Sequence, residues 1–198
     1  MIIRHKLTKC PRSIVVNHLR QKLKGQKVAI SCVYCSYKDQ AIQTPTSLIA
    51  SILYQILAIT KFISDELRAL YEHHELNKTR PTLEELFTEL QASVRGLERF
   101  FVVIDALDEC PRGTREPFLN HMRKLQPVAN LMITTRPARH VVNGFPEAAC
   151  VEIRAKDTDV RTYCQAKILS DDRLRYMRED ASLKNDVIGK LVENAQEM

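Results

Sequence analysis

The pattern of apolar and polar residues predicts strands alternating with helices. Segments 27–34, 99–105 and 129–135 are apolar on both faces, which is typical of strands buried inside a parallel sheet. Segment 150–154 is shorter and alternates, which predicts a strand near the sheet edge. Residues 1–7 show no clear period and predict at most one ragged strand. This order is typical of an α/β fold with a mostly parallel sheet.

In the segments between these strands, apolar residues recur at helical spacing. Ser13 is the expected N-cap of the first helix, and Gly25 is its expected end. Thr82 and Glu85 have the spacing of a capping box, which predicts a helix running to Val94. Further helices are expected at about residues 44–57, 61–73, 114–125, 157–168 and 181–195.

Composition and charge limit the function classes. The 198 residues are 44% hydrophobic and 27% charged, which suits a soluble globular protein with one core, or one domain and part of a second. No apolar run is long enough for a transmembrane helix, and the apolar part of the N-terminus is too short for a signal peptide. We therefore expect a cytoplasmic protein without membrane contact. The net charge of +6 is scattered among acids, which favours a solvated surface over a specific nucleic-acid site.

The chain has six cysteines, at positions 10, 32, 35, 110, 150 and 164. Because no secretion signal is found, a disulfide framework is not expected. Cys32 and Cys35 have C-x-x-C spacing, but they fall in a predicted strand, where residues three apart point to opposite faces. No second such pair and no histidine pair has zinc spacing. Buried thiols are therefore favoured over a metal site or a redox pair.

The clearest functional pattern follows the strand at 99–105. Asp105 comes directly after the apolar run, and Asp108 and Glu109 complete a D-x-x-D-E sequence. Carboxylates hold the divalent cation in phosphoryl transfer, and an acid directly after a buried strand is the Walker B arrangement. Asp105 fits the metal-holding role, and Asp108 and Glu109 fit the role of positioning or polarising water. The alternative is that these acids only form turns or helix caps.

A second polar strand end lies at the end of segment 129–135. Thr134, Thr135 and Arg136 follow an apolar run. Because parallel strands bring their carboxyl ends to one crevice, Arg136 could face the phosphates held by the metal at Asp105. Thr134 or Thr135 could hydrogen-bond the same group. The alternative is a structural ion pair between Arg136 and Asp105 or Asp108.

The sequence contains no phosphate-binding loop. Such a loop needs G-x-x-x-x-G-K-[ST], because backbone N–H groups must approach the phosphates closely. Glycines occur only at positions 25, 96, 113, 144 and 189, and Gly189-Lys190 is followed by Leu191. Only one half of a nucleotide site is therefore found in these residues.

The combination of segments 101–110 and 131–137 resembles the NACHT class of STAND P-loop NTPases. The chain looks closest to fungal NACHT proteins with a nephrocystin-3-like N-terminal module, which often carry ankyrin or WD40 repeats. Segments 13–19, 33–40 and 157–163 fit the same group, so that the resemblance covers about residues 13–198.

The resemblance implies a three-layer, P-loop NTPase-like α/β fold, with a mostly parallel sheet flanked by helices and a helical C-terminal extension. It implies that Asp105 holds Mg²⁺, that Asp108 and Glu109 activate water, and that Arg136, with Thr135 beside it, contacts the γ-phosphate. Members of this family are switches driven by ATP or GTP, and they act in fungal NLR-like signalling through protein partners or self-association. No specific nucleic acid and no membrane is implied.

Two departures change this expectation. Where the family has Gly-Lys-Thr before Ser13, this chain has residues 7–12, and the family's central first strand is missing or replaced by residues 1–7. The chain also stops where the family continues into an apolar helix. We therefore expect an NTPase-like module truncated at both ends, marginally soluble because its sheet lacks a central strand.

The expected domains are a degenerate or disordered remnant at 1–12, a NACHT-like core without its P-loop at 13–156, and the start of a helical domain at 157–198. We expect no cofactor for this chain, no catalysis, and action through protein interaction. The alternative is a nucleotide switch with Mg-dependent hydrolysis, if the full-length protein supplies the P-loop.

Overall fold

The computed structural model describes residues 2–5, 11–136, 141, 143–153 and 156–197. The expectation of a remnant at residues 1–12 falls partly outside these ranges. Arg154, the last residue of the predicted strand at 150–154, lies outside the described residues.

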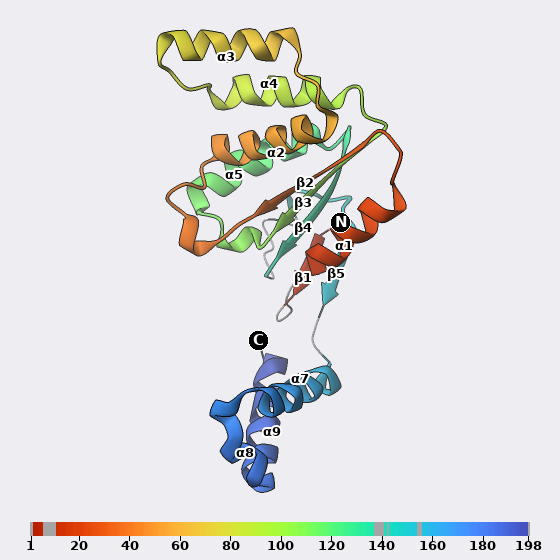
Figure 1. Cartoon of the computed structure of the whole chain (residues 1–198), viewed down its shortest axis with the longest axis vertical. Helices are drawn as coiled ribbons and strands as arrows, with labels where there is room; N and C mark the ends of the chain where they lie inside the picture. Colours follow the sequence, from red (N-terminus) through yellow and green to blue (C-terminus); the bar gives the residue numbers. More distant parts are fainter. Residues whose placement is uncertain (1, 6–10, 137–140, 142, 154–155, 198) are drawn as a thin grey trace. The chain divides into compact units, whose positions relative to one another are not determined.

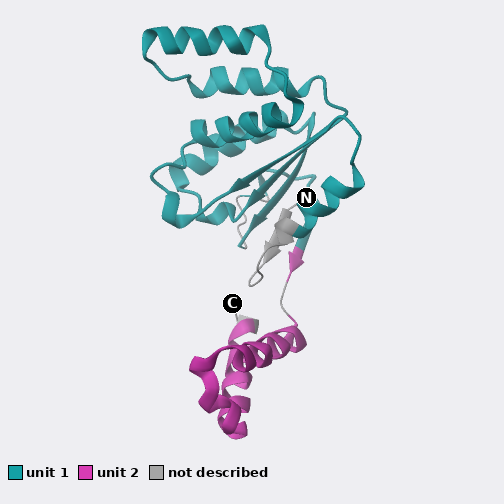
Figure 2. Cartoon of the chain, viewed as in Figure 1, with its two compact units in different colours: residues 1–3, 10–151 teal, residues 4–9, 152–198 magenta. Residues whose placement is uncertain are grey.

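The chain forms two compact units (Figure 2). Unit 1 consists of residues 1–3 and 10–151, and unit 2 of residues 4–9 and 152–198. No helix in the part of the chain that the structure describes has the length and apolar character needed to span a membrane.

The sheet is built on three parallel strands, as the apolar runs predicted. They are β2 (Val28–Tyr34), β3 (Arg99–Asp105) and β4 (Ala129–Thr135), and β3 pairs with both of the others. The full strand order is β2-β3-β4-β1-β5, with β1 at Ile2–His5 and β5 at Cys150–Ile153. The ragged strand expected within residues 1–7 is thus a four-residue strand between β4 and β5, so that the expectation of a sheet without this central strand is wrong.

Helices cover both faces of this sheet, which confirms the three-layer arrangement (Figure 1). Phe100, Val102 and Ile104 of β3 point to a buried apolar cluster that includes residues of α2, α4 and α5. On the other face, α1 residues and Val103 line a shared cavity of about 470 Å³. The helices of unit 1 are α1 (Pro11–Lys22), α2 (Pro45–Thr60), α3 (Asp65–Asn77), α4 (Leu83–Val94) and α5 (Arg112–Leu125).

The helix starts follow local capping chemistry. Thr82 and Glu85 form the predicted capping box of α4, and Thr44 and Ser47 form a second one at α2. By contrast, α1 begins at Pro11, two residues before the predicted cap, because proline suits the first helical position.

The free edge of β2 is protected by a side chain of α2. Gln55 Nε2 donates to the Cys32 carbonyl at 2.9 Å, and Gln55 Oε1 accepts from the Cys32 N–H at 2.8 Å. An outer strand normally presents unpaired backbone groups that can recruit another strand. The Gln55 amide satisfies one such pair of groups inside the molecule.

Unit 2 is helical, as expected for the C-terminal part. It contains α7 (Asp157–Ser170), the short α8 (Arg175–Glu179) and α9 (Ala181–Glu197). A small apolar core joins them, formed by Ile168, Met177, Ile188 and Val192. The short helix α8 was not predicted, because the charged segment after Ser170 shows little apolar periodicity.

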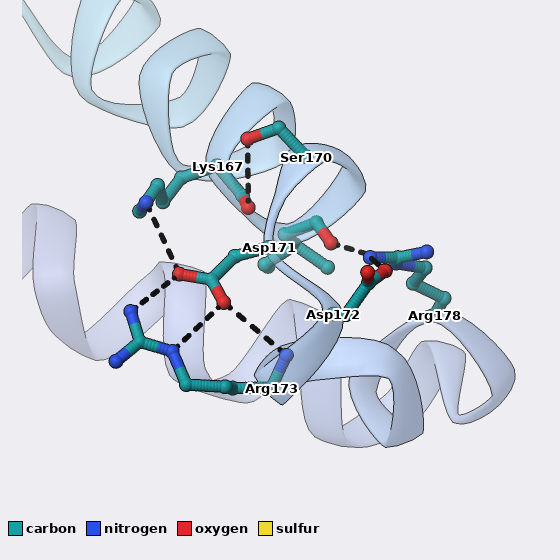
Figure 3. Close-up of polar contacts among 7 residues, drawn as sticks. Lys167, Ser170, Asp171, Asp172, Arg173 and Arg178 are labelled. Atoms are coloured by element: carbon teal, nitrogen blue, oxygen red, sulfur yellow. Dashed lines mark hydrogen bonds and ion pairs between the residues drawn. The ribbon is translucent and has the colours of Figure 1, made fainter.

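A polar cluster at the end of α7 fixes the turn toward α8 (Figure 3). The carboxylate of Asp171 accepts from the Arg173 guanidinium at 2.8 and 3.0 Å and from the Arg173 N–H at 3.2 Å. Lys167 Nζ lies 3.1 Å from Asp171 Oδ2. These contacts hold the pKa of Asp171 well below its usual range. The Arg173 side chain has the largest effect on this pKa, and Lys167 has the next largest.

Candidate functional site

The carboxyl ends of β2, β3 and β4 form one edge of the sheet, here called the carboxyl edge. Asp105 is buried there, with 7% of its surface exposed. Because Ile104 pairs with Ile133, the next residues, Asp105 and Thr134, also lie side by side. Thr134 Oγ1 donates to Asp105 Oδ1 at 2.6 Å and accepts from the Ala106 N–H at 2.9 Å.

Of the two threonines considered from the sequence, Thr134 therefore contacts the acid. Successive residues of a strand point to opposite faces. Thr135 accordingly points away from Asp105, and it is buried with 1% exposure. Its hydroxyl has no hydrogen-bond partner among the described residues.

The chain turns sharply after β3. Ala106 has φ 54° and ψ 45°, in the left-handed region that non-glycine residues rarely adopt. Leu107, which follows, is completely buried. We call residues 106–110 the acidic loop. Its strained start is offset by the bond to Thr134 and by a 2.8 Å bond from the Glu109 N–H to the Ala106 carbonyl.

Asp108 of the acidic loop pairs with Arg136. Arg136 Nε lies 2.9 Å from Asp108 Oδ2, and the Arg136 N–H donates to Asp108 Oδ1 at 3.1 Å. The Arg136 side chain is 74% exposed, whereas that of Asp108 is 20% exposed. Of the interpretations left open by the sequence, the structure thus shows an ion pair, and its partner is Asp108.

Glu109 ties the acidic loop to the segment after β2. Its Oε2 accepts from the Tyr37 N–H at 3.2 Å, and Gln40 Nε2 donates to the Glu109 carbonyl at 3.3 Å. This segment includes a single 3-10 turn, η1 (Tyr37–Asp39). The side chain of Glu109 therefore lies against a neighbouring loop.

Arg115 of α5 fixes the other side of the acidic loop, and sequence reasoning did not identify it. Its Nη2 donates to the Asp108 carbonyl at 2.7 Å and to the Cys110 carbonyl at 2.8 Å. The position of an arginine near the start of a helix, seven residues after an acid, gave no indication of these contacts.

These residues alone do not make up a complete magnesium–nucleotide site. Within the described ranges, no three His, Cys, Asp or Glu side chains gather closely enough to hold a metal ion. Asp105, Asp108 and Glu109 each contact a different neighbour. The sequence also lacks a glycine-rich loop, and residues 7–10, where the resemblance would place one, lie outside the described residues.

The short connection at 23–27 returns the chain from α1 to the start of β2. The Pro11 end of α1 is therefore directed toward the carboxyl edge (Figure 1). A helix start beside the carboxyl ends of parallel strands is the usual place for phosphate in α/β folds.

Sequence comparison gives the family. The nephrocystin 3 N-terminal family matches residues 10–136. The chain belongs to this family. No curated protein sequence matches it significantly.

The fold of the chain is similar to P-loop NTPase folds, and among solved structures the following resemblances are found. The Orc1 protein of Aeropyrum pernix, solved in complex with DNA, has a TM-score of 0.50 and 12% identity over 84% of this chain. The Walker-type ATPase PABY2304 of Pyrococcus abyssi has a TM-score of 0.38 and 15% identity over 91% of this chain. The chain spans 42% of the first structure's length and 65% of the second's.

Proposed function

We propose that the chain is a NACHT/STAND-type NTPase-like module of a signalling protein, and that with these residues it acts through protein contacts and hydrolyses no nucleotide. The observation that carries this proposal is the use of the three acids. Asp105 accepts from Thr134, Asp108 from Arg136 and Glu109 from Tyr37. Each carboxylate holds one piece of the carboxyl edge to another.

This arrangement differs from what hydrolysis requires. Carboxylates that serve a metal or a water must present lone pairs to a common point near the phosphates. Here Asp108 uses both oxygens on Arg136, so that the expected water-activating acid neutralises the expected phosphate-sensing arginine. The three acids therefore stabilise the edge that the family uses for nucleotide.

The second candidate is a nucleotide switch, in which a glycine-rich loop elsewhere in a longer protein completes the site. The 74% exposure of the Arg136 side chain favours it, since an exposed guanidinium can exchange Asp108 for a phosphate. In that case Asp105 would hold Mg²⁺, Asp108 and Glu109 would orient water, and Thr135 would lie near Arg136. The Mg²⁺ would neutralise phosphate charge.

The wider setting is proposed from the resemblance. The module would belong to a cytoplasmic, fungal NLR-like protein with ankyrin or WD40 repeats, and its partners would be proteins or further copies of itself. This setting requires no membrane or nucleic-acid contact by the module.

Titration with fluorescent ATP and GTP analogues in the presence of Mg²⁺ tests the proposal. We expect no saturable change in anisotropy up to about 1 mM, which corresponds to a binding free energy weaker than about −4 kcal/mol. The variants are Asp105→Asn and, as a matched control, Asp172→Asn, whose carboxylate in unit 2 is 99% exposed. Saturable binding that Asp105→Asn abolishes and Asp172→Asn retains would establish the switch instead.

A further inference from the structure

Two buried cysteines from distant parts of the sequence meet at the carboxyl edge. Cys35 follows β2 directly, and Cys110 ends the acidic loop. They are 5% and 2% exposed, and both are free thiols. Both side chains belong to the same buried cluster, and each is the strongest influence on the pKa of the other.

Backbone geometry independently places the two segments side by side. The Cys35 N–H donates to the Asp105 carbonyl at 3.0 Å, where β2 and β3 end. Further along, the Tyr37 N–H donates to Glu109 Oε2 at 3.2 Å. Bonds at Cys35 and Tyr37 thus tie this segment to the end of β3 and to the acidic loop, which ends at Cys110.

The surroundings of Cys110 favour a reactive sulfur. Arg115 donates to the Cys110 carbonyl at 2.8 Å, so that its guanidinium lies beside this residue. The neighbouring Cys35 thiol lowers the pKa of Cys110 most, burial opposes it, and the charge of Arg115 lowers it further, so that the pKa lies below its usual value. A thiol whose pKa is lowered, beside a cation and a second buried thiol, has the composition of a thiol oxidation site.

The geometry points to Cys35 and Cys110 as a dithiol–disulfide pair that a hydroperoxide oxidises. The Cys110 thiolate attacks the peroxide O–O bond, takes up one oxygen as a sulfenic acid, and releases an alcohol, or water from H₂O₂, after that product gains a proton. The Cys35 thiol then attacks the sulfenic sulfur, forms the S–S bond and releases water. The two sulfurs together lose two electrons, and the peroxide gains them.

This chemistry does not depend on the proposed function, since no nucleotide takes part. Its structural consequence lies at the same edge, however. A disulfide would fix the segment after β2 covalently to the loop that carries Asp108 and Glu109. Cys32 has C-x-x-C spacing with Cys35, but the sequence did not favour it as a redox partner, because the two fall in a predicted strand. Cys32 lies within β2, and the pKa of Cys35 is affected most by Cys110.

Peptide mapping of the full chain tests the pair. The chain is treated with H₂O₂, its remaining thiols are blocked with N-ethylmaleimide, and it is digested with trypsin without reductant. Cleavage at Lys27, Lys38, Arg99 and Arg112 places the two cysteines in peptides 28–38 and 100–112. We expect these peptides to become cross-linked on oxidation and to separate with dithiothreitol. If no such cross-link forms while the exposed Cys150 is oxidised, the proposal is wrong.

Peptide 28–38 also contains Cys32, which provides a matched control. Cys35→Ser should abolish the cross-link, whereas Cys32→Ser should retain it. The opposite result would assign the bond to Cys32 and overturn the proposal. Treating the unsubstituted chain with H₂O₂ in urea gives a control that does not depend on whether a variant folds. There we expect the specific cross-link to be lost, and an equal yield would show that the fold does not bring the pair together.

Oxidation should also change stability. Closing the long loop between the two cysteines should raise the midpoint of thermal unfolding on the order of 5 °C, reversibly with dithiothreitol. The Cys35→Ser/Cys110→Ser double variant should show no such shift. A shift of the same size in the double variant would contradict the assignment.

Discussion

Two aspartates in the two units make chemically similar ion pairs with different consequences. Asp171 in unit 2 binds Lys167 and Arg173, which lie within four residues of it. Asp108 in unit 1 binds Arg136, 28 residues away. The first cluster closes a turn that the local sequence defines. The second forms only when β3 and β4 pair, so that it depends on the tertiary fold.

The two aspartates also differ in how many contacts satisfy their carboxylates. The exposed Arg173 makes a bidentate contact with Asp171, next to a lysine (Figure 3). The exposed Arg136 makes one side-chain contact with Asp108. More of the hydrogen-bonding capacity of the Asp171 carboxylate is therefore satisfied by side chains. The Asp108–Arg136 pair is the one in which the arginine can exchange its partner.

The largest effect is expected from Arg115→Met, which removes the guanidinium that holds the acidic loop. Two carbonyls, of Asp108 and Cys110, lose a charged donor, so that the free energy of unfolding should fall by about 3 kcal/mol. Urea denaturation followed by circular dichroism measures it. Arg95→Met, at an exposed arginine of the same unit, is the control and should change stability little. Equal effects of the two variants would contradict the role of Arg115.

The next largest effect on stability is expected from the two adjacent threonines of β4, Thr134 and Thr135. Thr134→Val removes the donor to Asp105 and the acceptor of the Ala106 N–H, which should cost about 2 kcal/mol. Thr135→Val replaces a buried hydroxyl that has no partner among the described residues, and should be neutral or stabilising. The same denaturation measurement compares them. The assignment fails if Thr135→Val proves the more damaging variant.

Unit 2 should show acid-dependent stability through Asp171. Its pKa is lowered in the folded state, so that its stabilising effect is present above the unfolded pKa of about 3.9 and is lost as the pH falls below it. Asp171→Asn should therefore destabilise α7 and α8 at pH 7, and the difference from the native chain should shrink below about pH 4. Amide hydrogen exchange in α7 and α8 measures this. A difference that grows on acidification would exclude the mechanism.

The smallest effect is expected at the Asp108–Arg136 pair. A double-mutant cycle with Asp108→Asn and Arg136→Gln should give a coupling free energy of about 0.2–1 kcal/mol, because Arg136 is exposed. Added salt should reduce it. A coupling well above 2 kcal/mol, insensitive to salt, would show that the pair is not free to exchange.

The sequence predicted the elements whose stability depends on local pattern. The three buried strands and the Thr82 capping box follow from runs and spacings within a few residues. The helix α8 was missed because its apolar residues, such as Met177, are packed by neighbouring helices rather than arranged in a strong stripe.

The candidate site was predicted in position but not in detail. Strand ends brought Asp105, Asp108 and Arg136 to one edge, since parallel strands must end together. Which acid pairs with Arg136, and which threonine meets Asp105, depends on the register of β3 and β4. The contacts of Arg115 depend on tertiary packing, and no pattern in a single sequence encodes them.

We propose that the acids of the carboxyl edge are structural and do not bind nucleotide. Three backbone amides report on this role of the acids. The Ala106 N–H donates to Thr134, the Tyr37 N–H to Glu109, and the Arg136 N–H to Asp108. Hydrogen exchange of these amides, with and without Mg·ATP, is the most direct measurement. We predict protection without nucleotide and no change when it is added. Amides that exchange freely in its absence and become protected in its presence would contradict the claim.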